Sequence, residues 1–227
     1  MCSRYNLTAP PEAVRAWFAA TGEADFPPRY NIAPTQPALI VRNGTAAQRE
    51  LVLVRWGLIP SWAKEPGQIK TTLINARAES AADKPSFRGS LRHRRCLVPA
   101  TGFYEWTGPP GAKQPHHMTP RDGRLMALGA LSENWLGADG SELETMAILT
   151  VQANRAMGRL HDRMPLIIQP DDFDRWLDCR PGTAEFIQDL MRPAPEDFLD
   201  FSEVSRKLNN VRNEGAALLT DDAPRLL

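Results

Sequence analysis

The stretch RCLVPATGFYEW, residues 95–106, contains two strand-length apolar runs joined by a short break. Residues 95–100 and 102–106 belong to a longer series of such runs. The others are residues 38–42, 51–59, 124–131, 145–151 and 165–169, with turn sequences between several of them, Asn-Gly at 43–44 and Asp-Gly at 122–123 and 139–140. This series predicts mostly antiparallel strands that close on themselves.

Helices are predicted outside this set of strands. Residues 11–20 have prolines near the first turn and a glycine after the end, which are typical of helix boundaries. Three further segments have helical patterns, residues 153–161, 170–178 and 183–191. Because strands and helices do not alternate regularly, the sequence predicts an α+β fold with peripheral helices rather than a series of βαβ units.

The composition is that of an ordinary globular protein. The chain has 227 residues, of which 42% are apolar and 24% charged, and its formal net charge is zero. No apolar run approaches the roughly 18 residues of a membrane span, and the first ten residues lack the pattern of a secretory leader. We therefore expect a soluble, cytoplasmic protein with no membrane partner.

Neither a metal nor a cofactor is predicted. The three cysteines, Cys2, Cys96 and Cys179, are far apart and form no CxxC pair, and none of the four histidines has metal-ligand spacing to a cysteine. No glycine-rich nucleotide-binding motif occurs. Cys96 and Cys179 are expected to be buried structural thiols.

The basic residues are mostly arginine, since only five of the 27 are lysine. Arginine suits bidentate phosphate recognition, although codon bias in a high-GC genome explains the same excess. Clustering is more informative than the count. The stretch FRGSLRHRR, residues 87–95, predicts a local basic patch formed by Arg88, Arg92, Arg94 and Arg95.

The chain begins MCSRY, with a cysteine directly after the initiator methionine. Removal of Met1 would leave Cys2 with a free amine beside its thiol, and both groups are partly nucleophilic near neutral pH. Such a 1,2-aminothiol condenses with an aldehyde to an imine, and the thiol then closes a stable thiazolidine ring. The simpler alternative is that any small residue is tolerated after the initiator methionine.

Polar residues at two further sites are candidates for chemistry. Strand alternation places Glu105 on the same face as Phe103, where a partly desolvated carboxyl is suited to acid–base catalysis. Alternatively, Glu105 faces water from an edge strand. Asn75 and Arg77 alternate in LINARAES, residues 73–80, and an extended backbone would point both the same way. A turn asparagine beside a surface arginine is the alternative.

His161 lies between a predicted helix and a proline-bounded strand. Histidine exchanges protons near pH 7, which suits it to acid–base catalysis, although a structural histidine is the commoner case. Asp162 is adjacent in sequence, but neighbouring side chains seldom face each other. Arg163 is close enough to contact a phosphate at the same site.

Taken together, these stretches resemble the SOS response-associated peptidase family, whose members shield abasic sites in single-stranded DNA. The matching segments run in order from residue 2 to about residue 215: MC-x-RY, YNIAPTQ, WGLIPSWAK, INARAE, KPSFR, RRCLVPATGFYEW, HDRMP and VSRKLNNVRNEG. The resemblance implies one α+β domain over residues 1–227, built on a distorted β-barrel, with a peripheral tail from about residue 216. It also implies a positively charged groove for single-stranded DNA.

The resemblance assigns roles to residues of this sequence. The mature N-terminal Cys2 would form a thiazolidine crosslink with the aldehyde of an abasic sugar. Asn75 would hold the N-terminus and the sugar, Glu105 would help to open the sugar ring, and His161 would act as acid and base. The expected DNA contacts are Arg4, Arg77, Thr150, Arg163 and, as an aromatic platform, Trp62.

One position departs from the family pattern, and two other functions remain open. The family reads MCGRY where this chain has Ser3, which we expect to be tolerated. The first alternative function is a cysteine peptidase that cleaves other proteins with Cys2 and His161 as a dyad. The second is a non-catalytic single-stranded DNA-binding module. Under the main hypothesis the protein is a monomer that associates with the nucleoid when bound to DNA.

Overall fold

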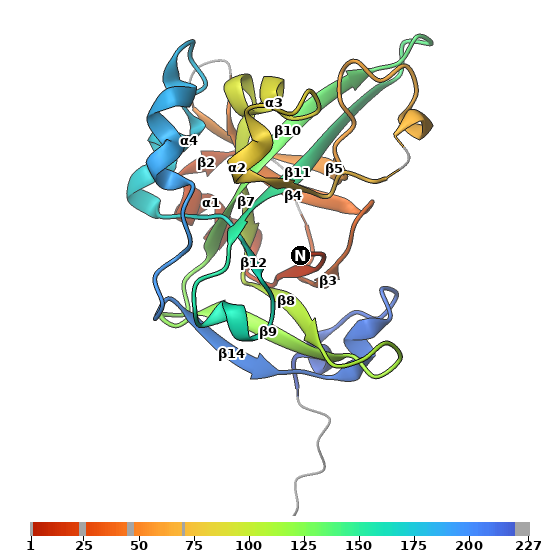
Figure 1. Cartoon of the computed structure of the whole chain (residues 1–227), viewed down its shortest axis with the longest axis vertical. Helices are drawn as coiled ribbons and strands as arrows, with labels where there is room; N and C mark the ends of the chain where they lie inside the picture. The colour runs from red at the N-terminus through yellow and green to blue at the C-terminus, as the bar shows by residue number, and fades with distance from the viewer. Residues whose placement is uncertain (1, 23–25, 45–47, 70, 221–227) are drawn as a thin grey trace, which may run out of the picture.

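Five strands of the computed structural model close into a barrel (Figure 1). The structure describes residues 2–22, 26–44, 48–69 and 71–220. In order of pairing the barrel strands are β11 (Glu142–Gln152), β10 (Met126–Leu136), β7 (Arg95–Ala100), β4 (Pro37–Asn43) and β5 (Arg49–Trp56). A parallel pairing of β5 with β11 closes the ring, and the other four pairings are antiparallel. The predicted α+β class and distorted, mostly antiparallel barrel are therefore confirmed.

A second sheet lies against one end of the barrel (Figure 1). Its strands pair in the order β14 (Leu199–Glu203), β9 (Gln114–Pro120), β8 (Gly102–Thr107), β1 (Tyr5–Leu7) and β3 (Arg29–Ile32). Short strands extend the barrel sheet: β6 (Asn75–Arg77) and β12 (Arg163–Pro165) pair with β11, β13 (Ile167–Ile168) pairs with β10, and β2 (Ala20–Thr21) pairs with β5. Residues 95–106 therefore pass from the barrel, in β7, directly into the second sheet, in β8.

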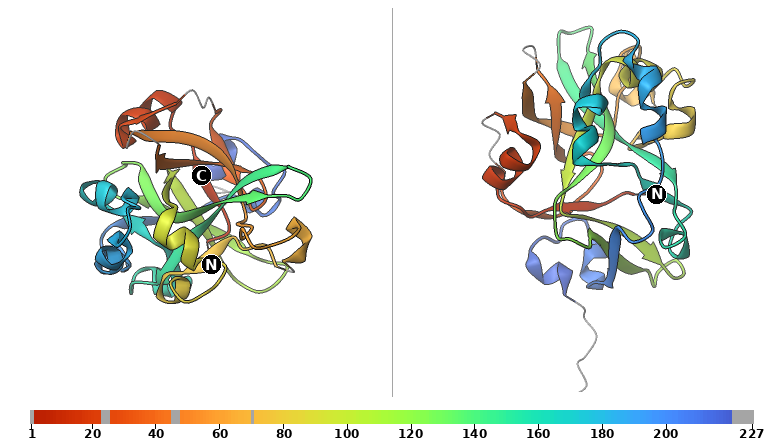
Figure 2. Two further views of the ribbon diagram at one scale, coloured as in Figure 1. Left: turned by 90° about the horizontal axis from the view of Figure 1, so that it is seen from above. Right: turned by 90° about the vertical axis from the view of Figure 1, so that its left-hand side faces the viewer.

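The helices lie outside the barrel (Figure 2). The α-helices are α1 (Pro11–Phe18), α2 (Ala78–Ala81), α3 (Arg88–His93) and α4 (Phe173–Leu177). The 3-10 helices are η1 (Pro66–Gln68), η2 (Met157–Arg159), η3 (Pro170–Asp172), η4 (Thr183–Leu190), η5 (Arg206–Asn209) and η6 (Ala216–Leu219). This peripheral placement agrees with the prediction.

The predicted helices are shorter in the structure, for local reasons. The first ends at Phe18, because Ala19 takes the left-handed conformation and residues 20–21 pair with β5. Residues 153–161 form only η2, where the Asn154 side chain accepts a bond from Met157 N–H and donates to Ala194 O. An asparagine that bonds to nearby backbone competes with a regular helix in this way. Residues 170–178 divide into η3 and α4, and residues 183–191 form the 3-10 helix η4.

The basic patch predicted at residues 87–95 exists only in part. Arg95 is 1% exposed, and its guanidinium donates to the carbonyls of Trp176, Leu91 and Asp178. It thereby satisfies carbonyls at the ends of α3 and α4, where a cation is also favoured by the helix dipole. Arg94 pairs with Glu133. Of the four arginines, Arg88 and Arg92 remain as exposed side chains outside the ion pairs found among the described residues.

The other composition-based expectations meet the following structural facts. Cys96 is fully buried, as expected, but Cys179 is only partly buried. No helix within the described ranges is long and apolar enough to cross a membrane. No group of three or more His, Cys, Asp or Glu side chains among those residues is arranged to hold a metal. The extent of the domain stays a prediction, since residues 221–227 of the expected tail lie outside the described residues, although Leu218 in η6 is buried.

A buried histidine joins β9 to β8 and β1. His117 is 7% exposed, stacks on Tyr104 with ring centroids 4.8 Å apart, and its Nε2 lies 3.0 Å from Asn6 Oδ1. The close packing requires Gly102, since a Cβ there would lie 2.1 Å from His117 Nε2. Burial lowers the pKa of His117 from 6.5 to about 4.

The lowered pKa of His117 predicts that the fold loses stability on acidification. Between pH 6.5 and 4 the unfolded chain binds a proton at this residue and the folded chain does not, so the free energy of unfolding falls as the pH falls. The full effect is about 3 kcal/mol, from a pKa difference of 2.5 at about 1.4 kcal/mol per pH unit. Urea unfolding at pH 7, 5.5 and 4 measures it. In His117→Gln the loss over this range should shrink, and an equal loss in both proteins would contradict the assignment.

Candidate active site

Cys2 lies in the interior beside the strand that carries Asn75. The Cys2 side chain is 0% exposed, and its Sγ makes a weak 3.8 Å contact to Arg4 O. Asn75, the first residue of β6, donates its Nδ2 to Cys2 O over 2.8 Å. Asn75 Oδ1 is buried and accepts no hydrogen bond from the described residues. The asparagine therefore holds the Cys2 main chain and keeps one acceptor available.

Glu105 approaches Cys2 from the neighbouring strand. Tyr104 N–H donates to Arg4 O over 3.0 Å, so β8 runs alongside residues 2–4 and brings Glu105 to the same region. Glu105 is 5% exposed, as expected for the face that it shares with Phe103, which is fully buried. The alternative of a solvent-facing edge glutamate is therefore wrong. Burial raises the pKa of the Cys2 thiol to about 12, and the nearby Glu105 carboxylate adds to the increase.

His161 and Arg163 lie next to the strand that pairs with β6. Thr150 of β11 is opposite Arg77 of β6 on one side and Pro165 of β12 on the other. His161 stands two residues before β12 begins, and its Nδ1 accepts the Arg163 N–H over 2.9 Å. Asp162 Oδ1 also lies 2.8 Å from that nitrogen, contrary to the expectation that these neighbours do not face each other.

The guanidinium of Arg163 binds within the protein. It forms a two-pronged pair with Glu79, with both nitrogen–oxygen distances at 2.7 Å, and also donates to Thr150 O over 2.5 Å. The side chain is 14% exposed. Because Nε is buried, a phosphate contact from Arg163, which the sequence predicts, would need a terminal nitrogen that Glu79 now holds. Thr150 itself is 0% exposed, so it has no direct access to a ligand and would act only through the residues that contact it.

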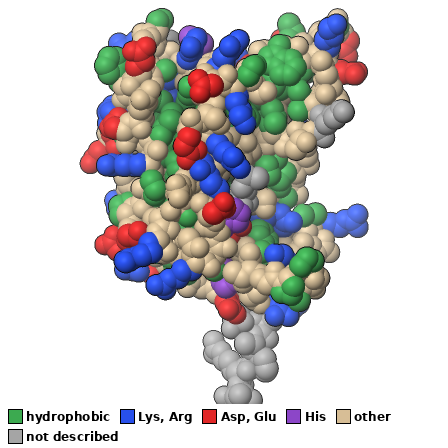
Figure 3. Space-filling view, in the orientation of Figure 1, with side chains coloured by type: hydrophobic (Ala, Val, Ile, Leu, Met, Phe, Trp, Pro, Cys, Tyr) green, Lys and Arg blue, Asp and Glu red, His purple; other side chains and the backbone are tan. Residues whose placement is uncertain are grey.

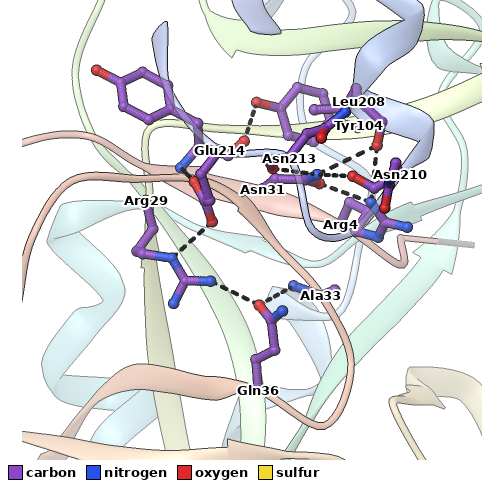
Figure 4. A network of polar contacts seen from close by, with 11 residues as sticks. Arg4, Arg29, Asn31, Ala33, Gln36, Tyr104, Leu208, Asn210, Asn213 and Glu214 are labelled. Atoms are coloured by element: carbon purple, nitrogen blue, oxygen red, sulfur yellow. Dashed lines mark hydrogen bonds and ion pairs between the residues drawn. The ribbon is translucent and has the colours of Figure 1, made fainter.

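Arg4 points to the C-terminal part of the chain (Figure 4). Its Nη1 donates to Asn31 Oδ1 over 2.8 Å and to Leu208 O over 3.1 Å, and the guanidinium lies 5.7 Å from the centre of the Trp106 ring. Asn31 is fully buried, and its Nδ2 donates to the carbonyls of Leu208, Asn210 and Asn213. Sequence reasoning missed Asn31, because the carbonyls to which it donates lie 177–182 residues further along the chain.

The remaining predicted DNA contacts are at the surface. Arg77 is exposed at the end of β6, and Trp62 is 52% exposed in the loop after β5. On the face in Figure 3, basic side chains are interspersed with acidic ones. A continuous positively charged groove therefore stays a prediction.

Residues 1–211 match the family model described as SOS response associated peptidase (SRAP). The chain belongs to this family. It is 35% identical over 223 residues to the abasic site processing protein YoqW of Bacillus subtilis, a match that covers 96% of this chain and 99% of YoqW. It is 32% identical over 222 residues to the abasic site processing protein HMCES of Gallus gallus, covering 85% of this chain and 66% of HMCES. The recognition made from the ordered motifs is thus confirmed.

Two solved structures have a similar fold. A Bordetella bronchiseptica protein is 27% identical, with a TM-score of 0.78 over 90% of this chain and 100% of its own. A Bacteroides thetaiotaomicron protein has a TM-score of 0.82 over 91% of this chain and 93% of its own. At 24% identity, the latter supports the fold alone.

Within this SRAP chain, Cys2, Asn75 and Glu105 are brought together by β1, β6 and β8. Arg163 contacts Thr150 of the adjoining strand β11, and its N–H donates to His161. Sequence reasoning did not single out Glu79, although it stands in the quoted INARAE segment two residues after Arg77. Its position in α2, directly after β6, is the signal that could have found it.

Proposed function

We propose that this protein captures abasic sites in single-stranded DNA as a covalent crosslink to Cys2. The observation that carries the proposal is the placement of Cys2 in an SRAP chain, with its carbonyl held by Asn75 and its thiol buried near Glu105. The relatives YoqW and HMCES, which are named abasic site processing proteins, support the substrate class. We infer that the product protects the lesion during the response to DNA damage.

The chemistry begins with a free Cys2 amine, which requires removal of Met1. Either a methionine aminopeptidase or self-cleavage supplies this step. The amine adds to the ring-opened aldehyde of the abasic sugar, and loss of one water gives an imine. The thiol sulfur then adds to the imine carbon and the nitrogen takes up a proton, which closes the thiazolidine. The net reaction joins an aldehyde and an aminothiol with release of one water.

Each neighbouring residue supports one part of this reaction. Asn75 Oδ1 is available to accept a hydrogen bond from the Cys2 amine or a sugar hydroxyl. Glu105 is positioned to move protons when the sugar ring opens and when water leaves. His161 serves as a second acid and base, including in reversal of the crosslink. Holding the amine and the aldehyde together lowers the entropic cost of the addition.

The thiol environment argues against a peptidase that cleaves other proteins. A cysteine peptidase needs a thiolate paired with histidine. The pKa of Cys2 is raised to about 12, so the thiol is protonated at neutral pH. A protonated thiol suits attack on an imine when a neighbouring base accepts the proton.

DNA binding is proposed to use the exposed side chains around this site. Arg77 and Trp62 are accessible for backbone contact and base stacking. Arg4 would reach the backbone from a position already fixed by its contact with Asn31, whereas Arg163 would do so only by exchanging one terminal nitrogen from Glu79 to a phosphate. A monomer fits a site that must admit a DNA strand.

A denaturing gel tests the proposed function. Protein with Met1 fully removed, as verified by intact mass, is mixed with single-stranded DNA containing one abasic site. We expect a slower band that survives heating and is absent for Cys2→Ala and for DNA without the lesion. No such band from the trimmed protein would refute the proposal. A band from Cys2→Ala would show that another nucleophile is responsible.

A further inference from the structure

Glu79 and Arg163 connect two parts of the candidate site. Glu79 lies in α2, directly after β6, which begins with Asn75. Arg163 opens β12, and β6 and β12 flank β11 on opposite sides at Thr150. The bidentate pair therefore passes across β11 and ties the segment of Asn75 to the segment of His161.

The pair is well formed although Glu79 is half exposed. Both guanidinium–carboxylate distances are 2.7 Å, and a third bond of 2.5 Å joins the guanidinium to Thr150 O. The hydrogen bonds from Arg163 lower the pKa of Glu79 from its usual value, so the carboxylate is ionised at neutral pH. Planar two-point pairing restricts orientation as well as distance. Arg163 is consequently held by its side chain, through Glu79 and Thr150, and by its main chain, through the pairing of β12 with β11.

The main chain of Arg163 acts in turn on the ring of His161. Its N–H donates to His161 Nδ1 over 2.9 Å, which favours the neutral ring that carries its proton on Nε2. Asp162 Oδ1 lies 2.8 Å from the same nitrogen and favours the other arrangement, in which Nδ1 carries the proton and donates it to the carboxylate. The tautomer of the neutral ring therefore depends on which of these two contacts dominates, and the position of the Arg163 amide sets the strength of one of them.

We propose that Glu79 is a positioning residue that acts through Arg163 on His161. Its carboxylate holds Arg163 so that the amide keeps the neutral His161 ring with the proton on Nε2, ready for donation. The catalytic part of this inference rests on the proposed crosslinking function. The opposing possibility is that Glu79 competes with a DNA phosphate for Arg163, and it predicts tighter DNA binding by Glu79→Gln.

The kinetic test uses Glu79→Gln, with Glu185→Gln as the matched control. Both residues are exposed glutamates that line the same cavity between α2, α3 and η4, so each substitution removes one negative charge from this region. Glu185 forms no ion pair with Arg163. At saturating abasic DNA, Glu79→Gln should lower the crosslinking rate constant about tenfold. Its non-covalent DNA affinity, measured in a Cys2→Ala background, should change only as much as the control.

A spectroscopic test needs neither DNA nor crosslinking. The nitrogen-15 shifts of the His161 ring, recorded at a pH where it is neutral, should show an unprotonated Nδ1 in the unsubstituted protein. Glu79→Gln should show a mixture of the two tautomers, and Glu185→Gln should not. Glu79→Asp, which keeps the charge on a shorter side chain, should give an intermediate rate and tautomer ratio. Thermal unfolding of all variants verifies that they are folded.

The outcomes separate this inference from the proposed function. If the unsubstituted protein does not crosslink, the proposed function fails, while the tautomer ratio still decides whether Glu79 orients His161. An unchanged tautomer ratio, or a wild-type crosslinking rate in Glu79→Gln, would overturn the positioning role. Tighter DNA binding with faster crosslinking would assign Glu79 to competition with phosphate instead.

Discussion

Cys2→Ser should abolish the heat-stable crosslink while leaving a reducible adduct. Serine keeps the N-terminal amine, so the imine with the abasic aldehyde still forms. Its hydroxyl is a much weaker nucleophile than a thiol, so the ring that protects the imine from hydrolysis is not closed. We expect a loss of more than about 100-fold in heat-stable product, because the stable species depends on the missing sulfur.

Borohydride trapping separates the two stages of this reaction. With borohydride, Cys2→Ser should give a band of normal mobility, because reduction converts the imine to a stable amine. The matched control is a protein that retains Met1, in which the Cys2 amine is part of a peptide bond, so no thiazolidine and no heat-stable band should form without borohydride. A heat-stable band from Cys2→Ser without borohydride would show that the thiol is dispensable and would contradict thiazolidine formation.

The strands of the barrel were largely readable from the sequence, because apolar runs of strand length reflect burial. The expected strand at residues 95–100 coincides with β7, and residues 102–106 fall within β8. The strand β9 was not predicted, because its sequence QPHHMTP contains two prolines and two histidines. It forms because β8 and β14 pair with it on both sides and His117 is buried against Tyr104, which are tertiary effects.

The candidate site likewise contains residues that the sequence predicted and residues that it did not. Cys2, Asn75 and Glu105 were found from local chemistry and from the family resemblance, and their roles stay predictions that the variants above test. Glu79 and Asn31 were not found, since each acts through partners far away in the sequence. Arg163 shows the limit most clearly. Its type predicts a phosphate ligand, but the fold gives its two terminal nitrogens to Glu79.

Glu105→Gln should slow crosslinking by roughly 100-fold, a typical loss for a general acid–base group. Glutamine has nearly the same shape but cannot accept and return a proton when the sugar opens and the imine forms. The rate is measured at saturating abasic DNA by quenching into denaturant and separating the adduct on a gel. Glu203→Gln, which removes a carboxylate from an exposed position on β14 of the same sheet, serves as a control for altered charge in the second sheet and should react normally.

Glu105→Gln should also make the Cys2 thiol more acidic. This effect distinguishes two possible roles of Glu105, proton transfer and control of thiolate formation. The Glu105 carboxylate contributes to the rise of the Cys2 pKa to about 12, so its removal should lower that pKa, while burial, the larger cause, remains. The Cys2 Cβ chemical shift followed against pH measures the change. If thiolate formation limited the reaction, Glu105→Gln would crosslink faster at neutral pH. A thiol that is more acidic but a reaction that is slower would assign Glu105 to the proton transfers of sugar opening and imine formation.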